Sequence, residues 1–217
     1  MRSRLWLRHN RTNVRTARLP PWLTFATGCA PQWDPLQRCF RPVTAATGES
    51  TVPGIFIAGD GAGIAGAAAA AHGGTLAALA VAERQSRIDA TTLQAETARI
   101  RAQNRRHLAF RPFHDTLYRP AQSDVVPVHD DTIVCRCEEV TAGEIRRLAR
   151  EGCTGPNQMK TFVRSGMGPC QGRLCGLTVA ELIAETRGVP VADVGYYRLR
   201  SPVKPITVAE LAAMTPI

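Results

Sequence analysis

Residues 134–141 read Val-Cys-Arg-Cys-Glu-Glu-Val-Thr, and residues 166–176 read Gly-Met-Gly-Pro-Cys-Gln-Gly-Arg-Leu-Cys-Gly. These two stretches hold four of the seven cysteines of the chain, as two close pairs separated by 32 residues. Four thiolates are the ligand set of a [2Fe–2S] cluster, in which each iron takes two of them. The spacing therefore predicts a cluster bound by Cys135, Cys137, Cys170 and Cys175.

The local sequence suggests how each pair presents its thiols. Residues 132–134 are typical of a short strand, and residues two apart in an extended segment point to the same side. Cys135 and Cys137 are therefore expected to hold one iron together. Cys170 and Cys175 lie where a turn enters a helix, so that free N–H groups and the positive end of the helix dipole favour an anionic cluster.

Two other interpretations of these cysteines stay open. Structural zinc sites usually contain Cys-x2–4-Cys pairs, so the Cys-x-Cys pair makes zinc the weaker alternative. Cysteine also behaves as a small hydrophobic residue, so the simplest interpretation is four buried thiols without a metal. Cys29, Cys39 and Cys153 have no partner at a comparable spacing and are interpreted as ordinary residues.

A second signal lies at residues 54–66, which read Gly-Ile-Phe-Ile-Ala-Gly-Asp-Gly-Ala-Gly-Ile-Ala-Gly. The apolar run predicts a buried strand, and its Gly-Asp end puts the Asp60 carboxylate at the edge where α/β sheets bind ligands. An aspartate there can accept hydrogen bonds from sugar hydroxyls, and the glycines open a helix whose N-terminus suits a pyrophosphate. The alternative is an ordinary tight turn in which Asp60 only caps the next helix.

The segments around this turn are easier to interpret. Residues 31–53 contain four prolines and are expected to be irregular. Residues 67–84 predict a helix, although a Gly-Gly pair interrupts its middle. Residues 89–108 predict a second, arginine-rich helix with a narrow apolar stripe.

The pattern predicts four parts along the chain. Residues 1–27 carry six arginines and no acid, and are expected to be a disordered basic leader. Residues 28–110 are expected to belong to a nucleotide-binding α/β domain. Three prolines make 111–131 a predicted linker. Residues 132–217 are expected to form a small, mainly helical domain, in which Thr-x-x-Glu capping boxes open two helices.

Composition excludes several classes of protein. A length of 217 residues with 44% hydrophobic and 21% charged residues is globular, and no apolar run approaches the roughly 20 residues that span a bilayer. The net charge of +9 is concentrated in residues 1–41, which hold eight arginines and one aspartate, so nucleic-acid binding has little support. An odd number of cysteines in a chain of this length indicates a reducing compartment, and we expect a cytoplasmic protein.

Taken together, these residues resemble a known family. Residues 135–141, 166–175 and 200–205 look like the C-terminal half of FAD-dependent alpha subunits of the opine oxidase, hydrogen cyanide synthase, dye-linked proline dehydrogenase and sarcosine oxidase type. Residues 52–63 are similar to the second FAD-contacting strand and turn of that family. The cysteine domain also resembles bacterioferritin-associated ferredoxin, which ends in Cys-x2-Cys, whereas the Cys-x4-Cys spacing here favours the alpha subunits.

The resemblance implies a fragment of a Rossmann-like FAD domain, followed by a small, mainly α, [2Fe–2S]-binding domain. In the family, the counterpart of Asp60 binds the ribityl chain of FAD. The FAD contacts implied for this chain are Gly59, Asp60, Gly61, Ala62 and Gly63. The family's first Gly-x-Gly-x-x-Gly loop is absent from this sequence, so FAD binding is expected to need the missing N-terminal portion of that domain or a partner.

The resemblance also implies a function. The chain is expected to be the electron-transfer alpha subunit, or its C-terminal fragment, of a heteromeric oxidoreductase with a flavin-containing beta subunit. Its substrate would be a C–N bond of an amino acid, imino acid or opine. No side chain is typical of a substrate acid or base, and His107 and His114 are expected to be solvated. The alternative is a ferredoxin-like [2Fe–2S] module with a redox or iron-responsive role and no enzymatic activity.

Overall fold

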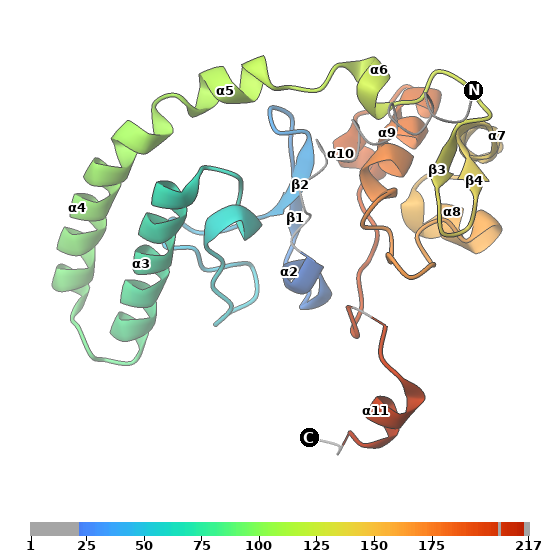
Figure 1. The fold of residues 1–217 in the computed structure, drawn as a ribbon. Coiled ribbons are helices and arrows are strands. Elements are labelled where there is room, and N and C mark those ends of the chain that lie inside the picture. Colours follow the sequence, from blue (N-terminus) through green and yellow to red (C-terminus); the bar gives the residue numbers. More distant parts are fainter. Residues whose placement is uncertain (1–21, 204, 215–217) are drawn as a thin grey trace. The chain divides into compact units, whose positions relative to one another are not determined.

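The computed structural model describes residues 22–203 and 205–214 of the chain. The described residues form two compact units, which divide between Ala121 and Gln122 (Figure 1). Most of the predicted basic leader lies outside the described residues. Its end is not irregular, because helix α2 (Trp22–Ala26) forms there and buries Trp22 and Phe25.

The first unit contains a β-hairpin that the sequence did not predict. Strands β1 (Pro31–Asp34) and β2 (Cys39–Pro42) pair antiparallel, and the Trp33 and Phe40 rings lie 5.0 Å apart. Pro31 and Pro42, two of the four prolines that indicated an irregular segment, pair with each other at the end of this two-stranded sheet, where a missing N–H group is tolerated. The Asp34 side chain accepts hydrogen bonds from the N–H groups of Leu36 and Gln37, both at 3.0 Å, and thereby forms the turn.

The predicted buried strand at 55–59 is not formed. Phe56 makes a single bridge with Glu49, and the N–H of Ile57 donates to the carbonyl of Gly48 at 2.8 Å. A parallel Rossmann strand needs neighbouring strands to take its hydrogen bonds, and the described part of this unit offers only a hairpin and a loop. A Rossmann-like sheet is therefore not confirmed, although the mixture of helix and sheet is.

Two long helices form the rest of the first unit. The 3₁₀ turn η1 (Gly59–Gly61) leads into α3 (Ala67–Arg84), which packs against α4 (Ala90–Leu108). Both predicted helices are confirmed, and the Gly-Gly pair does not interrupt α3. The N-cap of α3 is Gly66 without a side-chain cap, so the alternative that Asp60 caps this helix is wrong.

The predicted linker at 111–131 is partly helical. It contains α5 (Arg111–Leu117) and α6 (Gln122–Val125). Pro112 lies in the first turn of α5, where its missing N–H group has no helical partner to lose. The prolines of this segment therefore mark helix starts and ends as well as irregular chain.

The second unit is mainly helical, as predicted. Strands β3 (Ile133–Cys135) and β4 (Val140–Thr141) form a small antiparallel pair that leads into α7 (Ala142–Arg150). The helices that follow are α8 (Pro156–Val163), α9 (Gly176–Arg187), α10 (Val191–Val194) and α11 (Val208–Ala212). The predicted capping boxes are confirmed at the starts of α7 and α11. The fully buried core side chains include Ile145, Met159, Val179, Leu182 and Ile183.

Replacing Gly74 with Ala should stabilise the first unit. No atom lies within 4 Å of the Cβ that alanine would add, and glycine in a helix interior costs about 0.5–1 kcal/mol relative to alanine. Gly66→Ala is the matched control, because its surroundings are equally open but its φ of +96° is strained for alanine. Chemical denaturation should show a higher free energy of unfolding for the first variant and a lower one for the second.

Candidate functional site

The first pair of predicted ligands lies on the β3–β4 hairpin. Cys135 is the last residue of β3 and is completely buried, whereas Cys137 lies in the turn and is partly exposed. Glu139 closes this turn in the left-handed region, with φ of 53°. The prediction of an extended Cys-x-Cys segment is therefore wrong, and a tight turn presents the two thiols instead.

The second pair lies between α8 and α9. Gln171 and Gly172 adopt positive φ values of 51° and 81°, which wind the chain into a tight loop. Cys175 is the N-cap residue of α9, as expected of a turn that enters a helix. The N–H groups of the first helical turn therefore face the same region as the thiols.

The structure brings thiols of the two pairs into contact with each other. A hydrogen bond from Cys175 lowers the pKa of Cys135 to about 6, against the opposing effect of burial. A hydrogen bond from Cys175 is also the main cause that lowers the pKa of Cys170 to about 5. The same two contacts, together with burial, raise the pKa of Cys175 itself.

Backbone amides complete the surroundings of these sulfurs. The N–H groups of Gly166, Glu138 and Cys137 all lower the pKa of Cys135. The N–H of Cys170 lowers the pKa of Cys137, but burial and the neighbouring thiols raise it by more. The site therefore favours negative charge on some sulfurs and keeps a proton on others.

Glycine is required where the two loops meet. A Cβ at Gly168 would overlap the Cβ of Cys137, so the second loop can approach the hairpin only with hydrogen at this position. A Cβ at Gly166 or Gly172 would lie 2.6 Å and 2.8 Å, respectively, from atoms of the Tyr197 ring. The glycines of the motif therefore serve two contacts, one with the cysteine hairpin and one with an aromatic support.

Sequence reasoning did not find this support. Tyr197 is buried, and its hydroxyl donates to the carbonyl of Ser165 at 3.0 Å. The hydroxyl of Ser165 lies 3.1 Å from the same Tyr197 oxygen. Tyr196, also buried, packs against Gly176 at the start of α9. The signal available in the sequence was the Tyr-Tyr pair after Gly195, but nothing in its spacing relates it to the cysteines.

Arg173 connects the second loop to the C-terminal segment. Its guanidinium donates to the carbonyl of Cys170 at 3.4 Å and to the carbonyl of Val203. Arginine suits this role because its planar fork offers donors in two directions. The residues 200–203 of the motif-bearing tail are thereby attached to the loop that carries Cys170.

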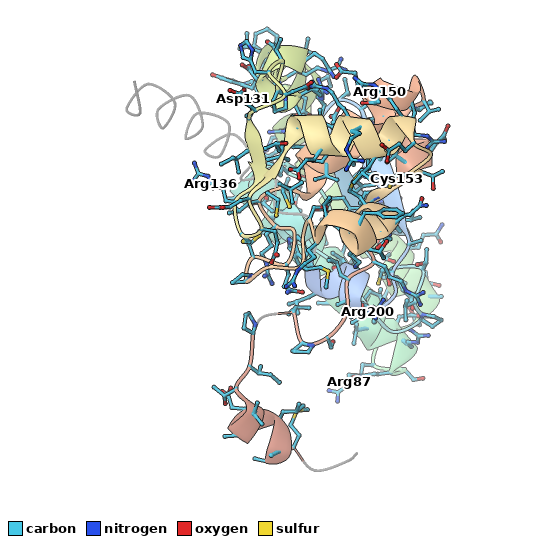
Figure 2. All side chains as sticks on the ribbon, turned by 90° about the vertical axis from the view of Figure 1, so that its right-hand side faces the viewer. Arg87, Asp131, Arg136, Arg150, Cys153 and Arg200 are labelled. Carbon is cyan, nitrogen blue, oxygen red and sulfur yellow. The ribbon has the colours of Figure 1, made fainter. Side chains whose placement is uncertain are left out.

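Cys153 is separate from this group. It lies in the loop between α7 and α8 (Figure 2), where its thiol faces the carbonyl of Gly155 at 3.6 Å and burial raises its pKa. As the described residues are placed, no group of three or more His, Cys, Asp or Glu side chains could hold a metal ion. The contacts among the four thiols run from Cys135 to Cys175, from Cys175 to Cys170 and from Cys170 to Cys137.

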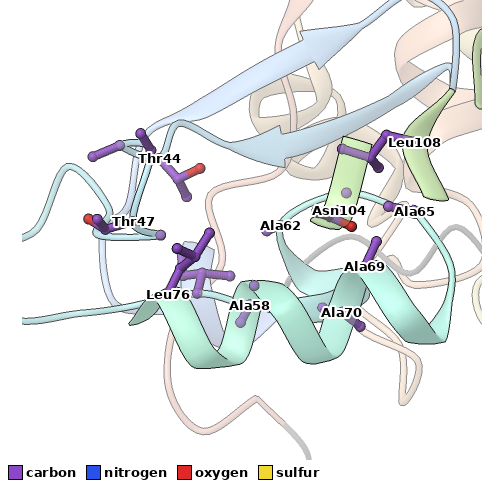
Figure 3. A pocket seen from close by; sticks show the side chains of 17 residues that line it. Thr44, Thr47, Ala58, Ala62, Ala65, Ala69, Ala70, Leu76, Asn104 and Leu108 are labelled. Carbon is purple, nitrogen blue, oxygen red and sulfur yellow. The ribbon is translucent and has the colours of Figure 1, made fainter. Parts of the chain in front are cut away.

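The glycine turn of the first unit lies at a cavity of about 340 Å³ (Figure 3). Gly59, Ala62 and Gly63 line it, whereas Asp60 and Gly61 do not, and Asp60 is exposed. Most of the other lining residues are small or apolar. They come from the loop at 44–48 and from α3.

Asn104 of α4 is a lining residue that sequence reasoning missed. Its Oδ1 is buried and has no hydrogen-bond partner among the described residues, although it is a strong acceptor. Asn104 sits in a polar, arginine-rich stretch, so its sequence context predicts only a solvated helix face. The cavity therefore contains one buried polar group among apolar walls.

Comparison with known proteins agrees with these motifs. Residues 130–215 match the family model of the sarcosine oxidase A3 domain. The chain is 53% identical to the A subunit of opine oxidase from Agrobacterium tumefaciens over 191 residues, which cover 88% of this chain and 38% of that protein. It is 35% identical to hydrogen cyanide synthase subunit HcnB of Pseudomonas aeruginosa over 162 residues, which cover 73% and 34%.

The family model covers the C-terminal part of the chain, and the relatives cover most of it. The C-terminal part of the chain is a sarcosine oxidase A3 domain. The chain belongs to the family of sarcosine-oxidase-alpha-like subunits, together with HcnB and the A subunit of opine oxidase. It spans well under half the length of these relatives. No solved structure matches the chain. None of the described helices is long and apolar enough to cross a membrane.

Replacing Gly168 with Ala should disrupt the contact between the two cysteine loops. The added Cβ overlaps the Cβ of Cys137, which the backbone holds and which cannot move away cheaply. We expect the melting temperature of the second unit to fall by several degrees, which corresponds to roughly 1–3 kcal/mol of overpacking. Gly74→Ala, in the first unit, controls for glycine replacement itself. An unchanged melting temperature for Gly168→Ala would contradict the close approach.

Proposed function

We propose that this chain is the electron-transfer subunit, or part of it, of a heteromeric flavin- and iron–sulfur-dependent oxidoreductase that acts on a C–N bond. Its relatives are named as subunits of opine oxidase and hydrogen cyanide synthase, which supports an oxidoreductase with several subunits. The substrate is oxidised on a partner subunit, and this chain conducts the electrons. An amino acid, imino acid or opine fits the resemblance.

The main support for this proposal is that the four cysteine thiols contact one another. Cys135, Cys137, Cys170 and Cys175 come from two loops far apart in the chain, and each has a pKa shifted by at least one of the others. Two closely spaced cysteine pairs that come together in this way are typical of a metal or iron–sulfur site.

The chemistry of the donor set fits a [2Fe–2S] cluster. Its four ligands are divided between two irons, so it needs two pairs of thiolates and no group of three around one ion. Backbone N–H groups face Cys135 and Cys170, and glycine at 168 leaves room beside the Cys137 sulfur. A cluster held here would transfer one electron at a time.

The second proposed group is FAD at the glycine turn of the first unit. Gly59, Asp60, Gly61, Ala62 and Gly63 are the proposed contacts, and the adjoining cavity would take part of the molecule. Its volume of about 340 Å³ is at the lower end for a ligand of drug size, so the chain would supply only part of the FAD site. The missing N-terminal portion of the FAD domain or a partner subunit would supply the remainder.

Anaerobic reconstitution tests the cluster. We expect about two iron and two sulfide per chain in the wild type and in Cys153→Ser, whose sulfur lies apart from the other four. Cys170→Ser should lose nearly all of both, because serine is a poor ligand for this cluster. Stoichiometric zinc without sulfide would contradict the proposal, as would an intact cluster in Cys170→Ser.

Replacing Asp60 with Asn tests the FAD site in the assembled oxidoreductase. Asp60 is exposed in the turn next to the lining residue Gly59, and its carboxylate would accept charge-assisted hydrogen bonds from the ribityl hydroxyls. Its loss should weaken FAD binding by about one to two decades and leave the iron content unchanged. Asp89→Asn is the matched control, because that carboxylate caps α4 by accepting from the N–H of Thr92 at 2.7 Å. The control should lower the melting temperature but keep the FAD dissociation constant.

A further inference from the structure

Helix α5 exposes a row of large apolar side chains. Phe110, Phe113, Leu117 and Tyr118 are 70%, 61%, 59% and 71% exposed. Phe110, Phe113 and Leu117 are spaced three and four residues apart and share one side of the helix, and Tyr118 lies at the edge of that side. We call these four residues the α5 stripe. Aromatic side chains bury about 150–250 Å² each in an interface, so the stripe offers roughly 400 Å² of apolar surface. An apolar patch of that size on a soluble protein usually marks an interaction site.

The opposite side of α5 is polar and faces its own unit. Arg111 and Asp115 form an ion pair in which both side chains are less than a quarter exposed. The Gln37 amide lies 3.4 Å from Asp115 and also donates to the carbonyl of Ile64 at 2.8 Å. The helix therefore packs on its unit through an ion pair and points its apolar side outward, which reverses the usual arrangement of a surface helix.

This orientation is fixed. Turning the stripe inward would break the contact between the buried Gln37 amide and Asp115, which would leave that amide with one acceptor fewer. Arg38 also donates to the carbonyl of Pro120 at 3.5 Å, just beyond the end of the helix. Side chains of the β1–β2 hairpin thus hold both α5 and the segment that follows it.

We propose that the α5 stripe is the docking surface for a different protein chain, whose complementary surface is an apolar groove edged by carboxylates. The charges around the stripe argue for such a rim. Arg105, Arg106 and Arg119 are exposed next to it along the chain. Between residues 99 and 120 the only acid in the sequence is Asp115, which is paired with Arg111. The rim of the stripe is therefore positive, and an acidic rim would complement it.

Two other occupants fit less well. A second copy would bring the same arginines against each other across a two-fold axis, in a chain whose net charge is already +9. An anionic membrane would attract the same arginines, but only a protein groove would also give the aromatic side chains fitted pockets, where such residues contribute most to binding. Phenylalanine, tyrosine and arginine together are the residue types enriched in protein interfaces.

The experiment measures binding to the other subunit of Agrobacterium opine oxidase, the enzyme whose A subunit is 53% identical to this chain. The choice of this probe rests on the proposed function. Phe113→Glu should weaken binding at least thirtyfold, as expected of an aromatic residue at the centre of an interface. Phe162→Glu is the matched control, because Phe162 is 58% exposed but lies on α8, and its affinity should equal that of the wild type.

A charge reversal tests the rim. Arg105→Glu should slow association severalfold and flatten its dependence on salt, because the lost charge steers the partner. Arg150→Glu is its control, since Arg150 is exposed at the end of α7 (Figure 2) and should leave both quantities unchanged. Circular dichroism and melting curves should match the wild type for all four variants.

Three results would overturn the proposal. The first is no binding by the wild-type chain, or equal binding by Phe113→Glu. The second is a wild-type dimer by light scattering that Phe113→Glu makes monomeric, which would assign the stripe to a second copy. The third is binding to phosphatidylserine vesicles that Phe113→Glu abolishes. Iron and sulfide are measured in the same samples, so that loss of the cluster with normal docking would count against the proposed function alone.

Discussion

The cysteine loop depends on one buried hydrogen bond. Tyr197 donates to the carbonyl of Ser165, and its ring fills the space that the absent side chains of Gly166 and Gly172 leave open. Burial is the main cause that raises the pKa of this phenol, so it keeps its proton and remains a donor. Glycines have no side chain that could pack against neighbours, so the loop that carries Cys170 needs support from outside the loop. The aromatic residue supplies the rigidity from a distant part of the chain.

The first unit shows the opposite case, in which local sequence was a poor guide. Residues 55–59 have the composition of a buried strand, but a strand exists only where neighbours accept its hydrogen bonds. Here the segment makes its backbone contacts with the loop at 48–50 and then turns into η1. The hairpin β1–β2 was missed for a related reason. Its prolines and its turn residue Asp34 are equally compatible with irregular chain until the pairing of Trp33 with Phe40 decides between them.

What could be predicted followed from local chemistry. The helices of 67–84 and 89–108, the two capping boxes and the turn before α9 all rest on interactions within a few residues. The candidate ligands could be named because cysteine pairs are rare enough for their spacing to matter. Tyr197 and Asn104 could not, since their roles arise from contacts across about 25 residues or more and their types are common in cores and on helix surfaces.

Helix α5 shows the limit of periodicity most clearly. An apolar stripe shows which residues share a face of a helix, but it does not show whether the protein's own core or another molecule covers that face. The deciding observation is the contact of Gln37 with Asp115 on the partly buried side of α5, because Gln37 is itself buried and its amide would lose this acceptor if the helix turned over. The helix keeps these polar contacts within its unit and leaves its apolar side exposed. A chain that does so gains by association the hydrophobic stabilisation that it gave up in folding, which couples its stability to the presence of its partner.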